Sequence, residues 1–142
     1  VTCSADCRAI VHLTSTGEVL HTLPHDGWVW SAVFLDEGTL ATGSADSKIR
    51  VWLLDHARRE HLLVKRLEEH TSWVVALDYA RSEQVLFSAS ADWSAKRWSV
   101  PEFDYMGELD IERPFSGTSV RRVTGLTQAE LRSLLRLGAI NE

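Results

Sequence analysis

The chain has 142 residues, of which 44% are hydrophobic and 25% are charged, and its formal net charge at pH 7 is −5. This composition is typical of a soluble globular domain. A negative net charge with scattered basic residues does not favour binding to a phosphate backbone, and no segment approaches the roughly 18 apolar residues of a membrane helix. The first residues also lack the basic and apolar regions of a signal peptide. We therefore expect a cytoplasmic protein whose partners include neither nucleic acid nor a membrane.

The chain contains two cysteines, Cys3 and Cys7, which are too few for a disulfide scaffold and are compatible with a reducing compartment. Together with His12 and His25 they could form a zinc site. Their spacing, however, does not match that of zinc fingers or zinc ribbons. We therefore expect buried or turn thiols at these positions, with no metal site and no cofactor.

Three copies of one repeat follow one another along the chain. The same tripeptide occurs as Ser4-Ala5-Asp6, Ser44-Ala45-Asp46 and Ser90-Ala91-Asp92. Six residues after each aspartate comes His12, Trp52 or Trp98. Before the second and third copies, residues 25–29 (His-Asp-Gly-Trp-Val) match residues 70–74 (His-Thr-Ser-Trp-Val). A period of 40 to 46 residues indicates a repeat architecture.

Short runs of β-branched, aromatic or small apolar residues, with turn residues between them, predict strands in every copy, and the run at 48–53 also alternates in polarity. The first copy holds the end of one strand and further strands at 9–13 and 18–23. The second copy is predicted to have strands at 28–35, 39–44, 48–53 and 62–67. The polar segment 55–61 could form a longer loop or a helical turn, and we favour a loop insertion. The third copy is predicted to have strands at 73–79, 85–90, 95–100 and 104–110.

The order of a histidine, then Ser-x-Asp, then a tryptophan resembles the WD-repeat family, whose blades each contain four antiparallel strands. The resemblance implies an all-β fold, a partial β-propeller of about two and three-quarter four-stranded antiparallel blades with a short C-terminal α-helix. The expected units are an incomplete blade at 1–24, complete blades at 25–69 and 70–112, and a tail at 113–142. Closed propellers have about four to eight blades. The remaining blades are therefore expected from the same longer protein or from another chain.

In this family a histidine, a serine or threonine, the turn aspartate and the tryptophan form a buried hydrogen-bonded tetrad. By position, the resemblance implies two such sets, His25, Ser44, Asp46 and Trp52 in one blade and His70, Ser90, Asp92 and Trp98 in the next. The first copy has His12 at the tryptophan position, so its tetrad is expected to be incomplete. The same residue types could form a Ser-His-Asp triad, but a triad needs an exposed nucleophile and an oxyanion site. The same His, Ser and Asp residues recur in successive repeats together with a core tryptophan, which favours a structural role. We therefore expect no catalytic residues and no enzyme.

The tail carries a capping box, with Thr127 at the N-cap and Glu130 three residues later. This pattern predicts a helix at about 128–137, whose apolar face is formed by Leu131, Leu134 and Leu135. Such a short helix needs a packing surface, so we expect it to dock on the last blade. Residues 115–139 are similar to tails of bacterial pentapeptide-repeat and WD-repeat proteins, which implies a bacterial source.

The resemblance implies a non-catalytic platform for protein interactions and, in view of the tail, the sensor end of a bacterial multidomain signalling protein. Two alternatives remain open. One is a structural piece that self-assembles through open blade edges, and the other, less favoured, is a fragment of a catalytic propeller. A catalytic propeller would need titratable groups on its inner strands, yet residues 28–35 and 73–77 contain none.

In this family the connections between the fourth and first strands, and between the second and third, lie on the face of the disc that receives partners. Here they carry four tryptophans, Trp28, Trp30, Trp73 and Trp93. The first three could instead pack between blades. Trp93 stands at a turn position usually held by glycine or asparagine, where we expect its ring to be exposed. We predict that these tryptophans bind a protein or peptide partner.

Overall fold

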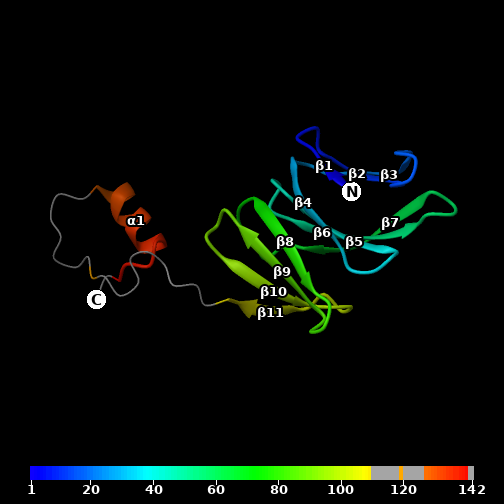
Figure 1. Cartoon of the computed structure of the whole chain (residues 1–142). Helices are drawn as coiled ribbons and strands as arrows, with labels where there is room; N and C mark the ends of the chain where they lie inside the picture. Colours follow the sequence, from blue (N-terminus) through cyan, green and yellow to red (C-terminus); the bar gives the residue numbers. More distant parts are fainter. Residues whose placement is uncertain (110–118, 120–126, 141–142) are drawn as a thin grey trace. The chain divides into compact units, whose positions relative to one another are not determined.

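The computed structural model of the protein describes residues 1–109, 119 and 127–140. The chain divides into two units, Val1–Leu109 and Asp110–Glu142. Within residues 1–109 all regular structure is β, and it forms three sheets in chain order (Figure 1). The described part of the second unit contains one helix. The all-β class with a short helix is thus confirmed.

Each sheet is a meander, because strands that follow one another along the chain are neighbours in the sheet and pair antiparallel. The first sheet has the order β1 (Thr2–Cys3), β2 (Arg8–His12), β3 (Val19–Pro24). The second has the order β4 (Val29–Phe34), β5 (Thr39–Ser44), β6 (Ile49–Asp55), β7 (Glu60–Leu67). The third has the order β8 (Val74–Ala80), β9 (Val85–Ser90), β10 (Ala95–Ser99), β11 (Tyr105–Glu108).

A loop insertion was expected at residues 55–61, after the third strand of the second sheet, but the structure has a longer hairpin there. β6 continues to Asp55 and β7 already begins at Glu60, so only residues 56–59 form the turn. Asp55 is paired with Glu60 across the two strands. Polar residues extend these strands because their side chains face solvent while the backbone continues to pair. The result is a long outer hairpin in place of a loop.

Each face of the second sheet packs against a neighbouring sheet. One face packs on the first sheet through a cluster of Ala9, Val11, Leu23, Val29, Leu40, Trp52 and Leu54. The opposite face packs on the third sheet through Leu35, Ala41, Ile49, Val51, Leu67, Val74, Leu86, Trp98 and Phe103. Neighbours such as Val51 and Trp52 belong to different clusters because successive side chains of a strand point to opposite faces.

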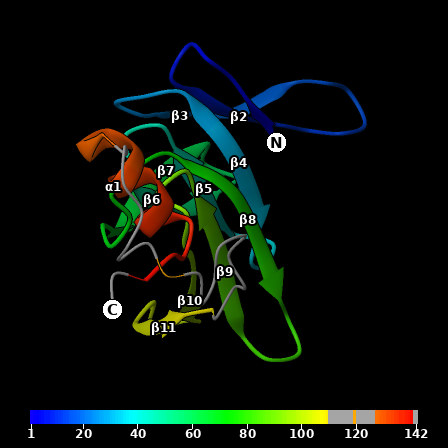
Figure 2. The ribbon, with the colours of Figure 1, turned by 90° about the vertical axis from the view of Figure 1, so that its left-hand side faces the viewer.

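The second and third sheets approach each other closely at Gly43. A Cβ atom at this position would lie 2.7 Å from Cγ1 of Val74, whose side chain is fully buried. Any larger residue would therefore push the two sheets apart. Figure 2 shows β4 and β8, the first strands of these two sheets, running side by side.

The second unit contains α1 (Gln128–Arg136), which begins at the predicted N-cap. The Thr127 hydroxyl accepts a hydrogen bond from the Glu130 backbone N–H, and the Glu130 carboxylate accepts one from the Thr127 backbone N–H. This reciprocal pair is the predicted capping box. No helix among the described residues has both the length and the apolar character needed to cross a membrane. Docking of α1 on the last blade stays a prediction. Of residues 115–126, which form the first part of the segment that resembles bacterial tails, only Ser119 is among the described residues.

Candidate functional site

The repeated Ser-Ala-Asp tripeptide builds the same turn three times. In every copy the aspartate backbone N–H donates to the hydroxyl of the serine, and the aspartate Oδ1 accepts the backbone N–H two residues later. The residue after each aspartate has a left-handed backbone, with φ of 66° at Cys7, 66° at Ser47 and 67° at Trp93. Glycine and asparagine adopt this conformation most easily. The tripeptide is therefore a turn motif.

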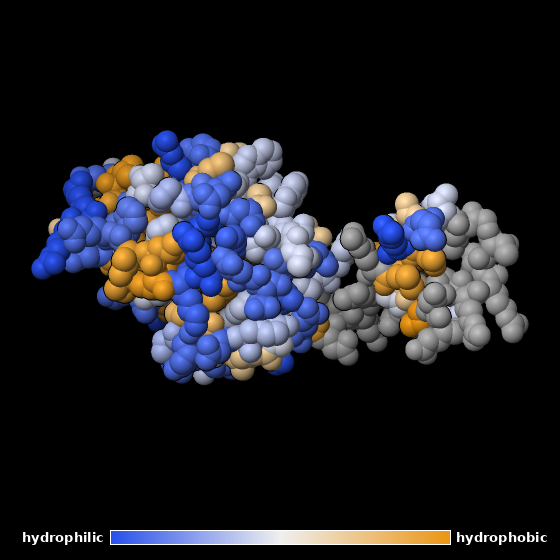
Figure 3. Space-filling view, turned by 180° about the vertical axis from the view of Figure 1, so that it is seen from behind, coloured by the Kyte–Doolittle hydropathy of each residue, from blue (hydrophilic) through white to orange (hydrophobic). Residues whose placement is uncertain are grey.

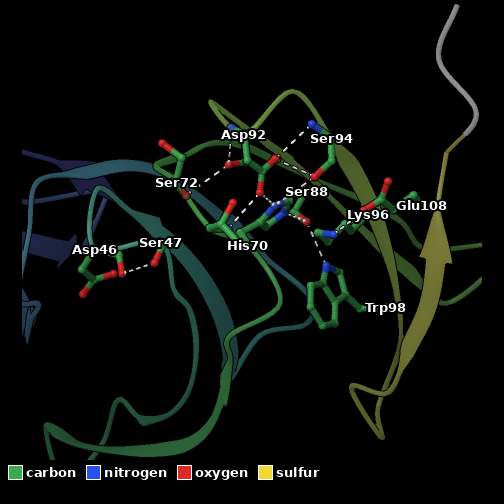
Figure 4. Close-up of polar contacts among 12 residues, drawn as sticks. Asp46, Ser47, His70, Ser72, Ser88, Asp92, Ser94, Lys96, Trp98 and Glu108 are labelled. Atoms are coloured by element: carbon green, nitrogen blue, oxygen red, sulfur yellow. Dashed lines mark hydrogen bonds and ion pairs between the residues drawn. The ribbon is translucent and has the colours of Figure 1, made fainter. Parts of the chain in front are cut away.

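One buried polar network joins four residues of the third sheet (Figure 4). Nδ1 of His70 lies 2.9 Å from Oδ2 of Asp92, and Nε2 of His70 lies 2.8 Å from the Ser88 hydroxyl. Nε1 of Trp98 donates to the same hydroxyl at 2.9 Å. His70, Ser88 and Trp98 are buried. Because these polar groups satisfy one another away from water, the network rigidifies the sheet and presents no exposed nucleophile.

The serines of the tripeptides, Ser44 and Ser90, are not members of the tetrads. The Ser90 hydroxyl donates to the carbonyl oxygen of Ser72 at 3.1 Å, and the Ser44 hydroxyl donates to that of Gly27 at 3.1 Å. Both serines thus tie the turn to the segment that precedes the first strand of the blade. The assignment expected for these two residues is corrected, and the hydroxyls between histidine and tryptophan belong to Thr42 and Ser88.

Strand register explains this correction. Trp98 on β10 is paired with Leu86 on β9. A side chain in a sheet reaches the diagonal neighbour two residues along the opposite strand, here Ser88, but not Ser90 a further two residues away. The sequence does contain a signal for the correct residue, because a hydroxyl side chain stands two residues before every copy of the tripeptide, at Thr2, Thr42 and Ser88.

The second sheet keeps three members of the network. Nε2 of His25 lies 2.8 Å from the Thr42 hydroxyl, and Nε1 of Trp52 donates to the same oxygen at 2.9 Å. Nδ1 of His25 donates to the Leu23 carbonyl oxygen at 3.0 Å instead of reaching Asp46. The expected contact of His25 with the turn aspartate is therefore replaced by a backbone contact.

Asp46 is paired with Arg50, a residue that sequence analysis did not single out. Nη1 of Arg50 lies 2.6 Å from Oδ2 of Asp46, and Nη2 lies 2.6 Å from Oδ2 of Asp26. Arg50 is 2% exposed, so its charge needs these carboxylates as compensation. Burial tends to raise the pKa of Asp46, but the adjacent Arg50 guanidinium and a hydrogen bond from the Lys48 backbone N–H hold it below the ordinary value.

The first sheet retains one contact that corresponds to the tryptophan–hydroxyl contact of the polar networks in the other two sheets. Nε2 of His12 lies 3.2 Å from the hydroxyl of Thr2, the positions that Trp52 and Thr42 occupy one repeat later. Its tetrad is thus incomplete, as expected from the sequence.

Cys3 and Cys7 are both free thiols and partly buried. Burial raises the pKa of the Cys3 thiol. Across residues 1–109 and 127–140, no group of three or more His, Cys, Asp or Glu side chains is placed to hold a metal ion.

We expect the unfolding temperature to fall on acidification from about pH 7 to about pH 4. Burial, followed by the charge of Arg50, lowers the pKa of His25 from 6.5 to about 4, and burial also lowers the pKa of His21 and His70. These histidines are neutral in the folded state but bind protons below pH 6.5 when unfolded. The stabilising contribution of His25 is thus complete above pH 6.5 and is lost as the pH falls toward 4, and the contributions of His21 and His70 change in the same direction.

Scanning calorimetry across this pH range checks the expectation. The His25→Gln variant removes one of the titrating groups, so its unfolding temperature should depend less steeply on pH than that of the wild type. Equal slopes for the two proteins would contradict the assignment to His25.

Four tryptophans lie at the end of the sheets where the tripeptide turns are found, and we call Trp28, Trp30, Trp73 and Trp93 the tryptophan face. The β5–β6 turn donates a backbone hydrogen bond to the carbonyl of Trp28, and the β9–β10 turn donates one to that of Trp73. The ring centroids of Trp28 and Trp30 lie 5.9 Å apart, and Trp30 stacks on Trp73 at 6.0 Å and 21°. All four side chains are between 44% and 59% exposed.

The tryptophan face spans two sheets. Trp30 belongs to β4 of the second sheet, whereas Trp73 immediately precedes β8 of the third, so their stacking joins the two. Trp93 lies within the β9–β10 turn itself. The structure thus brings three of the predicted partner-binding residues into one row and places the fourth in the adjacent turn.

Comparison with known proteins gives consistent matches for this architecture. The family model "WD domain, G-beta repeat" matches residues 17–52 and 62–99, together just over half of the chain. The Denticleless protein homolog of Xenopus tropicalis is 30% identical over 95 residues, which cover 67% of this chain and 13% of that protein. Autophagic-related protein 16.2 of Caenorhabditis elegans is 28% identical over 76 residues, which cover 54% of this chain and 14% of that protein.

A solved structure is similar as well. The crystal structure of the RRP9 WD40 repeats matches with a TM-score of 0.66 and 27% sequence identity, over 78% of this chain and 34% of that one. The chain therefore corresponds to 13–14% of the length of these two curated relatives and about a third of this structure.

Proposed function

The chain belongs to the WD40-repeat family, whose propellers serve as platforms for protein interactions, and from this premise we propose that its tryptophan face binds a protein or peptide partner. The observation that carries the proposal is the row of adjacent, half-exposed indole rings, in which the stacked pair Trp30 and Trp73 crosses from the second blade to the third. Closure of the ring by further blades, from the same longer protein or another chain, is part of the proposal.

The exposure of these four rings supports a role in binding and not in stabilising the fold. Contiguous apolar surface on a protein marks interaction sites, and tryptophan is enriched among the residues that dominate binding energy. Trp93 adds a second argument, because its left-handed backbone is unfavourable for a residue with a side chain, by about 1 to 2 kcal/mol. A tryptophan in such a turn gains little from packing when 59% of it is exposed.

A non-catalytic role agrees with the polar networks. In the third blade the imidazole of His70, the hydroxyl of Ser88 and the indole of Trp98 contact one another inside the fold. Self-assembly through blade edges is a separate proposal, which light scattering on the full chain would test. The bacterial source and the role as a signalling sensor rest on the tail sequence, whereas the two curated relatives come from a frog and a nematode.

We expect Trp30→Ala and Trp93→Ala each to weaken partner binding by about 2 kcal/mol, roughly thirty-fold, with little change in stability. Both rings are exposed enough that their removal leaves the hydrophobic core intact. Proteins retained by the immobilised full chain would be identified by mass spectrometry, and the strongest binder would then be titrated by calorimetry.

Leu13→Ala is the control for this experiment, because Leu13 is also exposed but follows β2 at the end opposite to its tripeptide turn. Its affinity for the partner should equal that of the wild type. Full affinity of both tryptophan variants would exclude the tryptophan face as the binding site.

A further inference from the structure

The long hairpin of β6 and β7 carries a second exposed apolar site, distinct from the tryptophan face. Leu53 and Leu62 are paired across the two strands and are 51% and 61% exposed. Asp55 and Glu60 form the pair nearest the turn. Since side chains alternate along a strand, all four point to the same face of the hairpin. With His61 they line an open cavity of about 350 Å³.

The neighbouring blade leaves these leucines uncovered. The third blade packs on this side of the second sheet, where Val51 and Leu67 belong to the shared core. Lys65 donates to the carbonyl of Glu102 in the third blade, and the hairpin continues from this contact toward its turn. Figure 3 shows the molecule from behind. Hydrophobic side chains gather there on the side of the Val1–Leu109 unit on which Figure 1 places β7.

The charges beside the leucines favour a basic ligand. Asp55 and Glu60 are like charges directly opposite each other, an arrangement that destabilises a strand pair. Asp55 accepts backbone hydrogen bonds from Ala57 and Arg58 and also pairs with the Arg58 side chain at 3.7 Å, whereas Glu60 forms no ion pair with any of the described residues. A lysine or arginine from a partner would supply Glu60 with the counter-charge it lacks, while an apolar residue beside it would cover the leucines.

The position of β7 favours an extended ligand. β7 is the last strand in the order of its sheet, so among the described strands none pairs with its outer edge. A peptide can add to such an edge through main-chain hydrogen bonds, with alternate side chains directed to one face. Glu60 and Leu62 are two residues apart on β7 and face the same way. A partner strand would match them with an apolar and a basic residue that are also two positions apart.

We propose that the β6–β7 hairpin docks an extended peptide segment that carries a large apolar residue two positions from a lysine or arginine. The probe is a fluorescein-labelled octapeptide with one leucine and one arginine at this spacing in a threonine background. Its binding to the full chain is measured by fluorescence anisotropy. Glu60→Lys and Leu62→Ser are each expected to weaken binding about ten-fold or more.

Matched variants and probes test whether the peptide binds at the hairpin and not elsewhere on the chain. Glu83→Lys makes the same charge change in the β8–β9 turn and should leave binding unchanged, as should Trp30→Ala on the tryptophan face. Two further probes are expected to bind weakly, one with glutamate in place of arginine and one N-methylated so that it cannot donate to β7. Equal affinity of the arginine and glutamate probes, full affinity of Glu60→Lys, or loss of binding in Trp30→Ala would overturn the proposal. If Leu62→Ser does not fold, the exposed Glu60 still decides the test.

Discussion

Replacing Trp98 by alanine is expected to lower the free energy of unfolding by about 3 to 5 kcal/mol. The indole is 2% exposed and lies in the core that joins the second and third blades. Its removal leaves a cavity there, and it also deprives the Ser88 hydroxyl of the Nε1–H donor. Equilibrium unfolding of the full chain in urea, followed by tryptophan fluorescence and circular dichroism, measures the change.

Trp98→Phe reduces the cavity contribution, because it keeps a six-membered aromatic ring in the core while it removes the Nε1–H donor. We expect this variant to lose about 1 to 3 kcal/mol, less than Trp98→Ala, because the cavity is smaller and the Ser88 hydroxyl keeps His70 as a partner. Trp93→Ala, in the exposed turn of the same blade, is the matched control and should change the free energy of unfolding little. A loss for Trp98→Ala no larger than that for Trp93→Ala would contradict the burial seen in the structure.

Arg50→Met is expected to destabilise the fold by about 3 to 5 kcal/mol, because it leaves a buried carboxylate without its cation. Asp46 is only 11% exposed and lies 2.6 Å from the guanidinium of Arg50. The other partner, Asp26, is 78% exposed and remains hydrated when the pair is broken. Asp26→Asn should therefore cost less than about 1 kcal/mol.

A double-mutant cycle in urea tests the assignment of this pair. Removing both charges with Arg50→Met and Asp46→Asn should be less destabilising than Arg50→Met alone, because no unpaired charge stays buried. If Asp26→Asn proved as costly as Arg50→Met, the surface pair and not the buried one would carry the stability.

The repeats and most strand positions could be predicted from the sequence because they depend on neighbours along the chain. The strands predicted at 39–44 and 85–90 coincide with β5 and β9, since each is a short run of small and apolar residues between strong turn residues. The capping box was equally accessible, because Thr127 and Glu130 are three residues apart on the same turn of helix. Local patterns of residues were therefore enough to predict the strands of each blade and the start of the helix.

The contacts of the site required the tertiary structure. Thr42, and not Ser44, receives the Trp52 indole because the register of β5 on β6 pairs Trp52 with Leu40. Asp46 could bond either to His25 or to Arg50, and only the packed structure places the guanidinium within 2.6 Å. The stacking of Trp30 on Trp73 likewise joins residues from different blades. Local patterns specify strands and turns, whereas strand register and the packing of one sheet on another decide which distant side chains meet.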